Sequence, residues 1–455
     1  MSLYGLMGTG RQGMGAAAAA LQTTGTNIAN VATPGYARRT AILETTESGG
    51  GVRYAQTART VDRFAQSHVV DEKGKQGSAQ ARSSALSEVE NTIAPATGSF
   101  GDKAIELVKA FNALAAFPID PSLRADVVAK TDNFAAAVKG AATALQSQSQ
   151  DLFGRSNDVA TEVNANLKKV ADLNKQISIA QVSGGDAGAL RDQRDQVISQ
   201  VGERLGAKTI EDKNGQVTLF AAGAVLVAGT DASELSLDLD PSSGAMRFFS
   251  TAPGGQKNEI TSRVDTGTLG GLREARDVDI AKTAANLDQY AFDVANAFNA
   301  IHQTGTGLDG GGSRPLFTVN ATAKGSAATL TINSDLVGRP DRIGASSSVA
   351  NLPGGNIVAL KLADLADTQS FGGATLADRF ASMATDIGFR KQGADSELQL
   401  RTDTLAVAQS LSDSANGVSL DEEMVNLTQY QRAFEASSKV MKVADELMQT
   451  MLNAV

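Results

Sequence analysis

The sequence contains no cysteine and no tryptophan, and only two of its 455 residues are histidines. Without cysteine the chain can form neither disulfides nor thiolate metal sites. Because His68 and His302 are its only imidazoles, a histidine-rich metal site is also excluded. No run of about 18 apolar residues occurs, so no segment has the composition of a membrane-spanning helix. These absences leave a protein that depends on packing rather than on cross-links or metals.

Charge is also scarce, at 20% of residues, and the formal net charge is −9. An acidic chain is a poor ligand for nucleic acid, so we expect no nucleic-acid partner. The first 43 residues hold no acid and only three bases, Arg11, Arg38 and Arg39. The opening "MSLYGLMGTG" has no basic region, and the longest apolar run near it is 16–21, so we expect no cleavable secretory signal.

What the sequence does have is an apolar stripe with coiled-coil spacing at each end. The N-terminal stripe consists of Leu3, Met7, Gly10, Met14, Ala17, Leu21, Thr24, Ile28 and Val31. The C-terminal stripe includes Leu420, Met424, Leu427, Phe434, Met441, Met448 and Leu452. The pattern predicts two long amphipathic helices that either pair with each other or pack separately on their own domain cores.

The N-terminal helix should end in the stretch "NIANVATPGYARR". Pro34 cannot continue a helix and biases Thr33 towards an extended conformation. Gly35 permits the positive φ of a tight turn, and Tyr36 can bury its ring while its hydroxyl forms a hydrogen bond.

Between the ends, helical and β patterns alternate. Asp120 followed by Pro121 is a helix start, and a helical pattern continues from there to about residue 181. Residues 60–94, 101–116, 184–206, 272–304 and 373–416 also read as helices, whereas 207–268 and 314–350 read as β or loop. Asn214-Gly215 indicates a two-residue hairpin. The predicted fold class is mainly α with β insertions, in an elongated multi-domain rod.

Candidate chemistry is sparse. The segment "GTGRQG" at 8–13 matches a dinucleotide fingerprint, but that fingerprint needs a preceding strand, and glycines that allow close helix packing are the favoured interpretation. His68 and His302 fit structural roles better than catalytic ones. Asp192 and Asp195 alternate with arginines, which is typical of a salt-bridged helix surface. We therefore expect no enzyme activity, no cofactor and no metal.

The segment "ANVATPGYARR" resembles the N-terminal signature of flagellar rod, hook and hook-associated proteins, with Asn30, Thr33, Pro34, Gly35 and Tyr36 as the matching turn. The segment "GVSLDEEMVNLTQYQRAFEASSKVMKVADELMQTMLNAV" resembles the C-terminal helix of the same family. In the middle, "DPSLRADV", "LRDQRDQVISQVGERLGAKT", "TGTLGGL" and "ANAFNAIHQTG" are similar to hook-associated proteins of the hook–filament junction. The similarity is weak across 314–370, where an outer β domain could be reduced or missing.

This resemblance implies three domains. Residues 1–35 with 416–455 would form an inner coiled coil of the two terminal helices. Residues 36–206 with 269–312 and 371–415 would form a helical rod built on a central bundle of long helices. Residues 207–268 with 313–370 would form an outer β-rich domain.

The implied function is that of a structural subunit, secreted by the flagellar type III export apparatus, in a ring between hook and filament. It would polymerise with copies of itself through a terminal-helix face and contact hook protein and hook-associated protein 3. That face consists of Leu3, Met7, Met14, Leu21, Ile28, Leu420, Met424, Leu427, Phe434, Met441, Met448 and Leu452. An export chaperone would bind Leu420, Met424, Leu427, Phe434 and Met441. The alternatives are a hook or rod subunit and, from another class, a nucleotide-binding enzyme.

Overall fold

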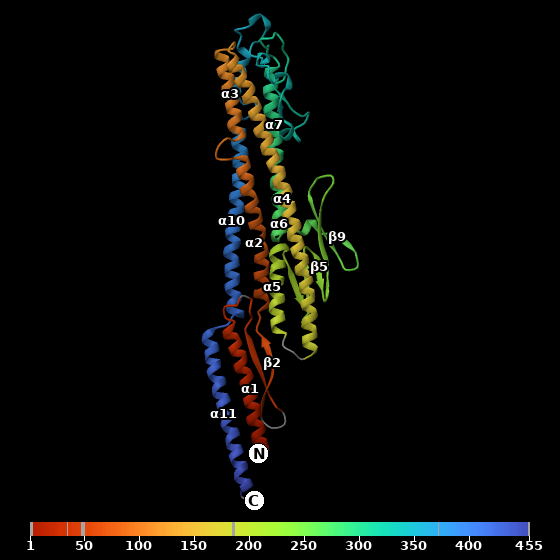
Figure 1. Ribbon diagram of the computed structural model, residues 1–455, viewed down its shortest axis with the longest axis vertical. Coiled ribbons are helices and arrows are strands. Elements are labelled where there is room, and N and C mark those ends of the chain that lie inside the picture. The colour runs from red at the N-terminus through yellow and green to blue at the C-terminus, as the bar shows by residue number, and fades with distance from the viewer. Residues whose placement is uncertain (1–2, 34, 47–50, 184–186, 372, 454–455) are drawn as a thin grey trace.

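The computed structural model describes residues 3–33, 35–46, 51–183, 187–371 and 373–453; Pro34 of the expected turn lies outside this set. The chain forms a long, narrow rod of helices, with both chain ends at the same tip (Figure 1). No helix in the described ranges is both long enough and apolar enough to cross a membrane.

Helices dominate the structure. They are α1 (Leu3–Ala29), α2 (Arg63–Ile93), α3 (Phe100–Ala116), α4 (Pro121–Val182), α5 (Gly188–Leu205), α6 (Gly267–Glu274), α7 (Ala281–His302), α8 (Ser326–Thr329), α9 (Ile357–Ala363), α10 (Leu376–Asn416) and α11 (Leu420–Asn453). A π turn, η2 (Ala275–Ile280), joins α6 to α7. Single 3-10 turns lie at η1 (Thr261–Arg263), η3 (Ser334–Leu336), η4 (Pro340–Arg342), η5 (Val349–Asn351) and η6 (Asp364–Ala366).

The strands are short and antiparallel. They are β1 (Arg39–Thr45), β2 (Val52–Arg59), β3 (Lys208–Glu211), β4 (Val217–Ala221), β5 (Ala224–Ala228), β6 (Asp231–Ala232), β7 (Glu234–Leu239), β8 (Met246–Thr251), β9 (Lys257–Glu259), β10 (Phe317–Thr318) and β11 (Thr331–Ile332). They form the hairpins β1-β2 and β10-β11, a four-stranded sheet β3-β4-β5-β6 and a three-stranded sheet β7-β8-β9. The predicted mainly α fold with β insertions in an elongated rod is confirmed.

The long helix α4 begins where the sequence predicts. The Asp120 carboxylate accepts hydrogen bonds from the amides of Ser122 (2.7 Å) and Leu123 (3.4 Å), and Pro121 occupies the first helical turn. A proline at this position loses no helical hydrogen bond, because the first amides of a helix have no partner within it. The helix then runs for 62 residues and forms the backbone of the rod.

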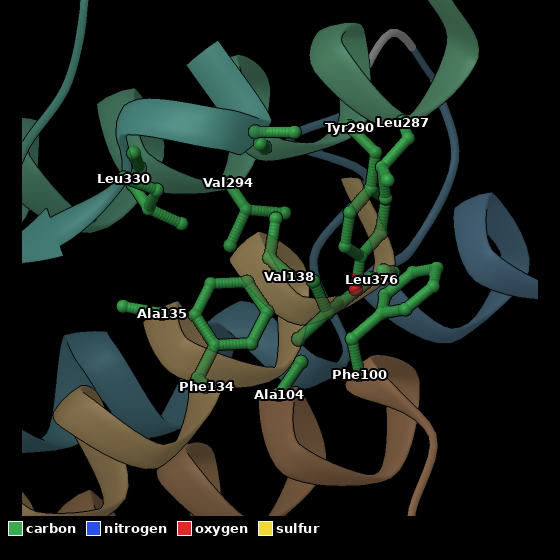
Figure 2. Packing of buried hydrophobic residues seen from close by; sticks show 14 of the residues in the cluster. Phe100, Ala104, Phe134, Ala135, Val138, Leu287, Tyr290, Val294, Leu330 and Leu376 are labelled. Carbon is green, nitrogen blue, oxygen red and sulfur yellow. The ribbon is translucent and has the colours of Figure 1, made fainter. Parts of the chain in front are cut away.

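A hydrophobic core fills the half of the rod farthest from the chain ends. Phe100, Phe134, Tyr290 and Phe317 meet there edge to face or tilted, with ring centroids 5.3 to 6.5 Å apart in successive contacts. Figure 2 shows Phe100, Phe134 and Tyr290 converging from α3, α4 and α7. A second core lies lower on the rod, between α4, α5 and the two larger sheets.

A buried charge cluster joins three helices between these cores. Asp279, on the π turn, is 1% exposed, and its carboxylate accepts a 2.9 Å hydrogen bond from Arg82 Nε on α2. Arg390 Nη1 on α10 lies 3.4 Å from the other oxygen. Because a buried carboxylate is costly without a partner, these two arginines hold α2 and α10 against the π turn.

Three expectations from the sequence differ from the structure. The β3–β4 connection is a five-residue loop, not a two-residue one, because Glu211 pairs with Val217 and the Asp212 carboxylate accepts from the amides of Asn214 and Gln216. Residues 313–370 hold only the two-residue strands β10 and β11. Residues 313–370 pack in the core farthest from the chain ends, whereas residues 207–268 pack in the second core, lower on the rod. The two segments therefore do not form one β domain.

The third difference concerns residues 36–59, which were expected in the helical rod. Within this segment, residues 39–45 and 52–59 pair as the strands of the hairpin β1-β2, which lies along α1 next to the chain ends (Figure 1). Strand patterning in this stretch is weak because most of its residues are exposed or half-buried, so no clean alternation marks it.

His302, at the end of α7, is buried and neutral. Its Nε2 accepts a 3.0 Å hydrogen bond from the Gly344 amide, so Nδ1 carries the proton and donates to the Arg314 carbonyl at 2.7 Å. Burial lowers its pKa to about 4. Protonation would break the bond to Gly344, which ties the 313–370 segment to α7.

We therefore predict that the free energy of unfolding falls as the pH drops from about 6.5 to about 4. The unfolded chain binds a proton on His302 in this window and the folded chain does not, a difference of up to about 3 kcal/mol. Urea titrations across this range measure it, with His302→Gln as the comparison. An equal pH dependence in parent and variant would exclude this role for His302.

Candidate functional site: the terminal helix pair and its joint with the rod

The terminal helices α1 and α11 pack along each other, which is the first of the two alternatives that the coiled-coil spacing left open. Two glycines of α1 lie directly against α11. A Cβ placed on Gly10 would lie 2.8 Å from Met441 Cγ, and one on Gly13 would lie 2.6 Å from Ser437 Oγ. Both distances are too short for a carbon atom, so these glycines permit the close contact between the two backbones.

The buried surface of α1, which packs against both α11 and the hairpin, is made mainly of small residues. On α1 the buried residues are Gly10, Ala16, Ala17, Ala20, Thr24 and Asn27. The predicted large residues Leu3, Met7, Met14, Leu21 and Ile28 are half-buried and flank this surface. On α11, Ala444 is fully buried, and Leu427, Met441 and Met448 are half-buried. The other predicted α11 residues, Leu420, Met424, Phe434 and Leu452, are exposed.

Asn27 anchors the turn that follows α1. It is fully buried, and its amide Nδ2 donates to the Arg39 carbonyl at 2.7 Å. Its Oδ1 accepts from the Tyr36 hydroxyl at 2.8 Å and from the Arg39 amide at 3.0 Å. One side chain therefore joins the last turn of α1 to the first residue of β1. Sequence reasoning missed Asn27; the signal was an asparagine inside a helix, where that residue has a low intrinsic propensity.

The expected turn residues form the loop around this anchor. Asn30 Nδ2 donates to the Thr26 carbonyl at 2.8 Å, and Asn30 Oδ1 accepts from the Thr33 hydroxyl at 3.2 Å. Gly35 has a φ of +79°, the left-handed conformation that the sequence predicted for it. The Tyr36 ring lies under the Arg39 guanidinium, whose carbon is 5.1 Å from the ring centroid.

The hairpin is tied to α11 by Arg38. Its guanidinium contacts Glu422 at 2.7 Å and Glu423 at 2.9 Å, in the first turn of α11. Glu423 is 2% exposed, so its charge depends on this partner. The Arg38 amide donates to the carbonyl of Asn416, the last residue of α10, at 3.1 Å. Arg38 thus lies where the hairpin, α10 and α11 meet.

A second set of ion pairs connects the hairpin to the rod. Arg39 and Arg59 are opposite each other across β1 and β2. Asp192 on α5 lies between them, 3.2 Å from Arg39 Nη2 and 2.7 Å from Arg59 Nε, and Asp195 lies 2.7 Å from Arg59 Nη2. Burial raises the pKa of Asp192, and the two arginines oppose that shift. Asp192 and Asp195 are salt-bridged, as the sequence predicted, but the hairpin rather than the neighbouring arginines of α5 supplies their partners.

The joint is loosely packed around these polar contacts. A cavity of about 620 Å³ lies between the end of the hairpin, the start of α2, α5 and β3, and one of about 420 Å³ lies between the hairpin, α2, α5 and the end of α10. Both cavities are lined by Arg59 and Asp195. Ion pairs rather than an apolar core therefore set the angle between the terminal pair and the rod.

Comparison with known proteins agrees with this architecture. The family model described as the flagellar hook-associated protein FlgK helical domain matches residues 86–317, about half of the chain. The chain belongs to the FlgK family of flagellar hook-associated proteins. A second family model, the C-terminal region of flagellar basal body rod FlgEFG proteins, matches residues 411–454.

Three relatives that align with this chain over nearly their whole length are all named flagellar hook-associated protein 1. Flagellar hook-associated protein 1 of Salmonella typhimurium is 24% identical over 97% of this chain and 98% of that protein. The proteins of the same name from Escherichia coli and Bacillus subtilis are 23% and 27% identical, each over 98% of this chain and over 99% and 97% of their own lengths. These alignments run over 506 to 546 positions, more than the 455 residues of this chain, so the relatives carry insertions that it lacks.

A solved FlgK structure supports the fold. The flagellar hook junction protein FlgK from Burkholderia pseudomallei matches with a TM-score of 0.52 and 22% identity, over 56% of this chain and 47% of that chain. The FlgK family is one of structural flagellar proteins and not an enzyme family. The segment "GTGRQG" accords with this, since residues 3–8 are already helical and provide no strand before it.

We predict that a bulky residue at Gly10 forces the FlgK-family helix pair apart, whereas the same residue at Gly8 does not. A Cβ placed on Gly8 would have no atom within 4 Å, so Gly8→Val meets open space and Gly10→Val meets Met441. Hydrogen exchange of the α11 amides near Ser437 reports the difference. We expect protection to fall at least tenfold in Gly10→Val only, and equal protection in both variants would exclude close packing at Gly10.

We also predict that Asp192→Asn loosens the joint. It removes the carboxylate that lies between Arg39 and Arg59 and leaves Asp195 as the acid of α5 that contacts Arg59, at a cost of about 2 kcal/mol for a largely buried pair. Since the chain lacks cysteine, spin labels on Ser396→Cys and Ser438→Cys measure the distance between α10 and α11. The distance distribution should broaden in Asp192→Asn but not in Glu44→Gln, which removes an exposed ion pair with Arg53. If the distance distribution between α10 and α11 is unchanged in both variants, contacts other than those of Asp192 fix the angle between the terminal pair and the rod.

Proposed function

We propose that this chain is a structural subunit that forms the junction ring between the flagellar hook and filament and is needed for filament assembly. Subunits polymerise through their terminal helices. The curated relatives, which align over nearly their whole length and are named hook-associated protein 1, support this role. The match of 411–454 to rod proteins fits a C-terminal helix that many axial proteins share, so the middle of the chain is what favours the junction over a hook or rod subunit.

The observation that carries polymerisation is that α11 has two exposed apolar edges, one on each side of its seam with α1. The first edge consists of Val425, Val440, Val443, Leu447 and Met451, and the second of Leu420, Met424, Phe434 and Leu452. Helical spacing separates them, because the buried positions Glu423 and Ala444 lie between the two sets around the helix. Exposed apolar residues on both edges do not stabilise an isolated subunit. In a polymer, each edge can be buried against a different neighbour.

Two different contact surfaces on one subunit are what a ring or helical polymer requires. Such head-to-tail contacts close into a ring when a whole number of the rotations that relate one neighbour to the next makes up 360°. In this arrangement α1 and α11 form the innermost layer, with hook protein on one side of the ring and hook-associated protein 3 on the other. The subunit reaches this extracellular site through the flagellar type III export apparatus, and it binds no cofactor or metal.

Deletion of the gene tests the proposed function. We expect cells with hooks but without filaments, and flagellin released into the medium. Cells without hooks would instead support a hook or rod subunit, and cells with normal filaments would contradict the proposal. A saturable NAD titration would favour the remaining alternative, a nucleotide-binding enzyme using residues 8–13.

An export chaperone that holds the C-terminal helix before secretion is part of the same proposal. Of its five expected contacts, Leu420, Met424 and Phe434 lie on the second exposed edge, while Leu427 and Met441 are half-buried towards α1. The first three can therefore enter the apolar groove of a chaperone while α1 stays in place.

We predict that Phe434→Asp weakens chaperone binding at least tenfold, because it places a charge in an apolar groove. Val443→Asp, on the first edge, is the matched control and should bind as the parent does. Isothermal titration of each purified variant with the chaperone gives the affinities. Equal losses for both variants would place the chaperone on the whole helix rather than on the second edge.

A further inference from the structure

The helix α10 has two apolar faces, and the structure buries only one of them. Ile387, Ala394, Leu405 and Ala408 are buried in the rod, where α10 packs along α2. A second stripe consists of Phe389, Leu400, Val407 and Leu411, whose exposed fractions are 68%, 54%, 70% and 55%. Their spacings of 11, 7 and 4 residues keep all four on one face of the helix. This face runs for about 33 Å along the rod.

The opposite edge of the rod carries a second exposed apolar site. Ile179 and Val182, in the last turns of α4, are 60% and 89% exposed. In Figure 1, α10 borders one edge of the rod, and the C-terminal half of α4 lies towards the other edge, beside the larger sheets. The lower end of α10 and the end of α4 both lie in the part of the rod nearest the terminal pair. No described element covers either site.

The charges around the two sites are complementary. On α10, Asp403 precedes Val407 by four residues and therefore lies on the same face as the apolar stripe. On α4, Lys168 and Lys175 precede Val182 by fourteen and seven residues, so all three lie on one helix face. Neither lysine has an ion-pair partner among the described residues, and one acid, Asp172, lies on the same face. The apolar stripe on α10 therefore carries an acid, Asp403, and the apolar site on α4 carries two lysines of opposite charge.

We propose that the α10 stripe docks on the α4 site of a second copy of this chain, so that neighbouring rods contact each other side by side. This inference rests on the proposed function and assigns the surfaces that rods use in the polymer. The contact is head-to-tail, since each subunit contributes its α10 stripe to one neighbour and its α4 site to the other. In the proposed ring this contact adds a second layer of contacts between neighbouring subunits. It lies farther from the ring axis than the contacts made by the terminal helices.

Cross-linking in assembled flagella tests the contact, since a chain without cysteine allows clean placement of reactive thiols. Val407→Cys with Ile179→Cys, treated with a short bis-maleimide on purified hook–filament preparations, should give a ladder of covalent dimers, trimers and larger oligomers. Each single variant should give none, because a head-to-tail contact brings no residue next to its own copy. Val407→Cys with Val337→Cys, at the far end of the rod, is the matched control.

Charge reversal provides the second measurement. Asp403→Lys and Lys175→Glu, each added to the cross-linking pair, should reduce the oligomer yield several-fold, and the two together should restore it. If Val407→Cys prevents incorporation, Leu411→Cys takes its place.

The outcomes separate this inference from the function on which it rests. Absence of the parent chain from purified hook–filament preparations would overturn the proposed function. Incorporated variants that cross-link no more than the control pair, or that cross-link as single variants, would overturn the side-by-side contact and leave the function standing.

Discussion

The approach of α1 to α11 at Gly10 and Gly13 is the contact on which the terminal part of the molecule depends. These helices come from opposite ends of the chain, and their packing places the start of the hairpin and the start of α11 side by side. Because Met441 and Ser437 occupy the space that a side chain would need, the helices reach a short separation along their seam. The larger apolar residues are then displaced to the flanks, where they remain available to neighbours.

Beyond the end of this seam, polar contacts connect the hairpin to α1, α11 and α5. Asn27 fixes the hairpin to α1, Arg38 fixes it to α11, and Arg39 and Arg59 fix it to α5. Directional hydrogen bonds and ion pairs specify an angle better than apolar contacts do, since they weaken steeply with misalignment. The terminal pair and the rod each have internal packing, but between them lie two cavities and a few charges. The angle between the terminal pair and the rod can therefore change with less loss of buried surface than a change inside either part would cause.

Exposed apolar surface on this molecule is organised rather than scattered. The two edges of α11 and the stripe on α10 follow helical spacing over several turns, and Ile179 and Val182 lie within one turn of each other at the end of α4. In an isolated soluble protein, surface of this extent is a liability for aggregation. In a subunit whose neighbours lie on both sides it supplies the association energy, while the charges beside it select the correct neighbour.

The sequence by itself determined the local structure. The Asp120-Pro121 start of α4, the positive φ of Gly35 and the coiled-coil spacing of both ends depend on residues close in the chain, so pattern and capping rules were sufficient. The partners of Asp192, the three hydrogen bonds of Asn27 and the position of residues 313–370 were decided only by the tertiary structure. Each depends on a group that lies between 9 and more than 150 residues away in the chain. A local sequence pattern does not indicate which distant side chain completes a buried hydrogen bond or neutralises a buried charge. The same holds for α10, whose two apolar faces look alike in the sequence, since only the packing of α2 determines which one is buried.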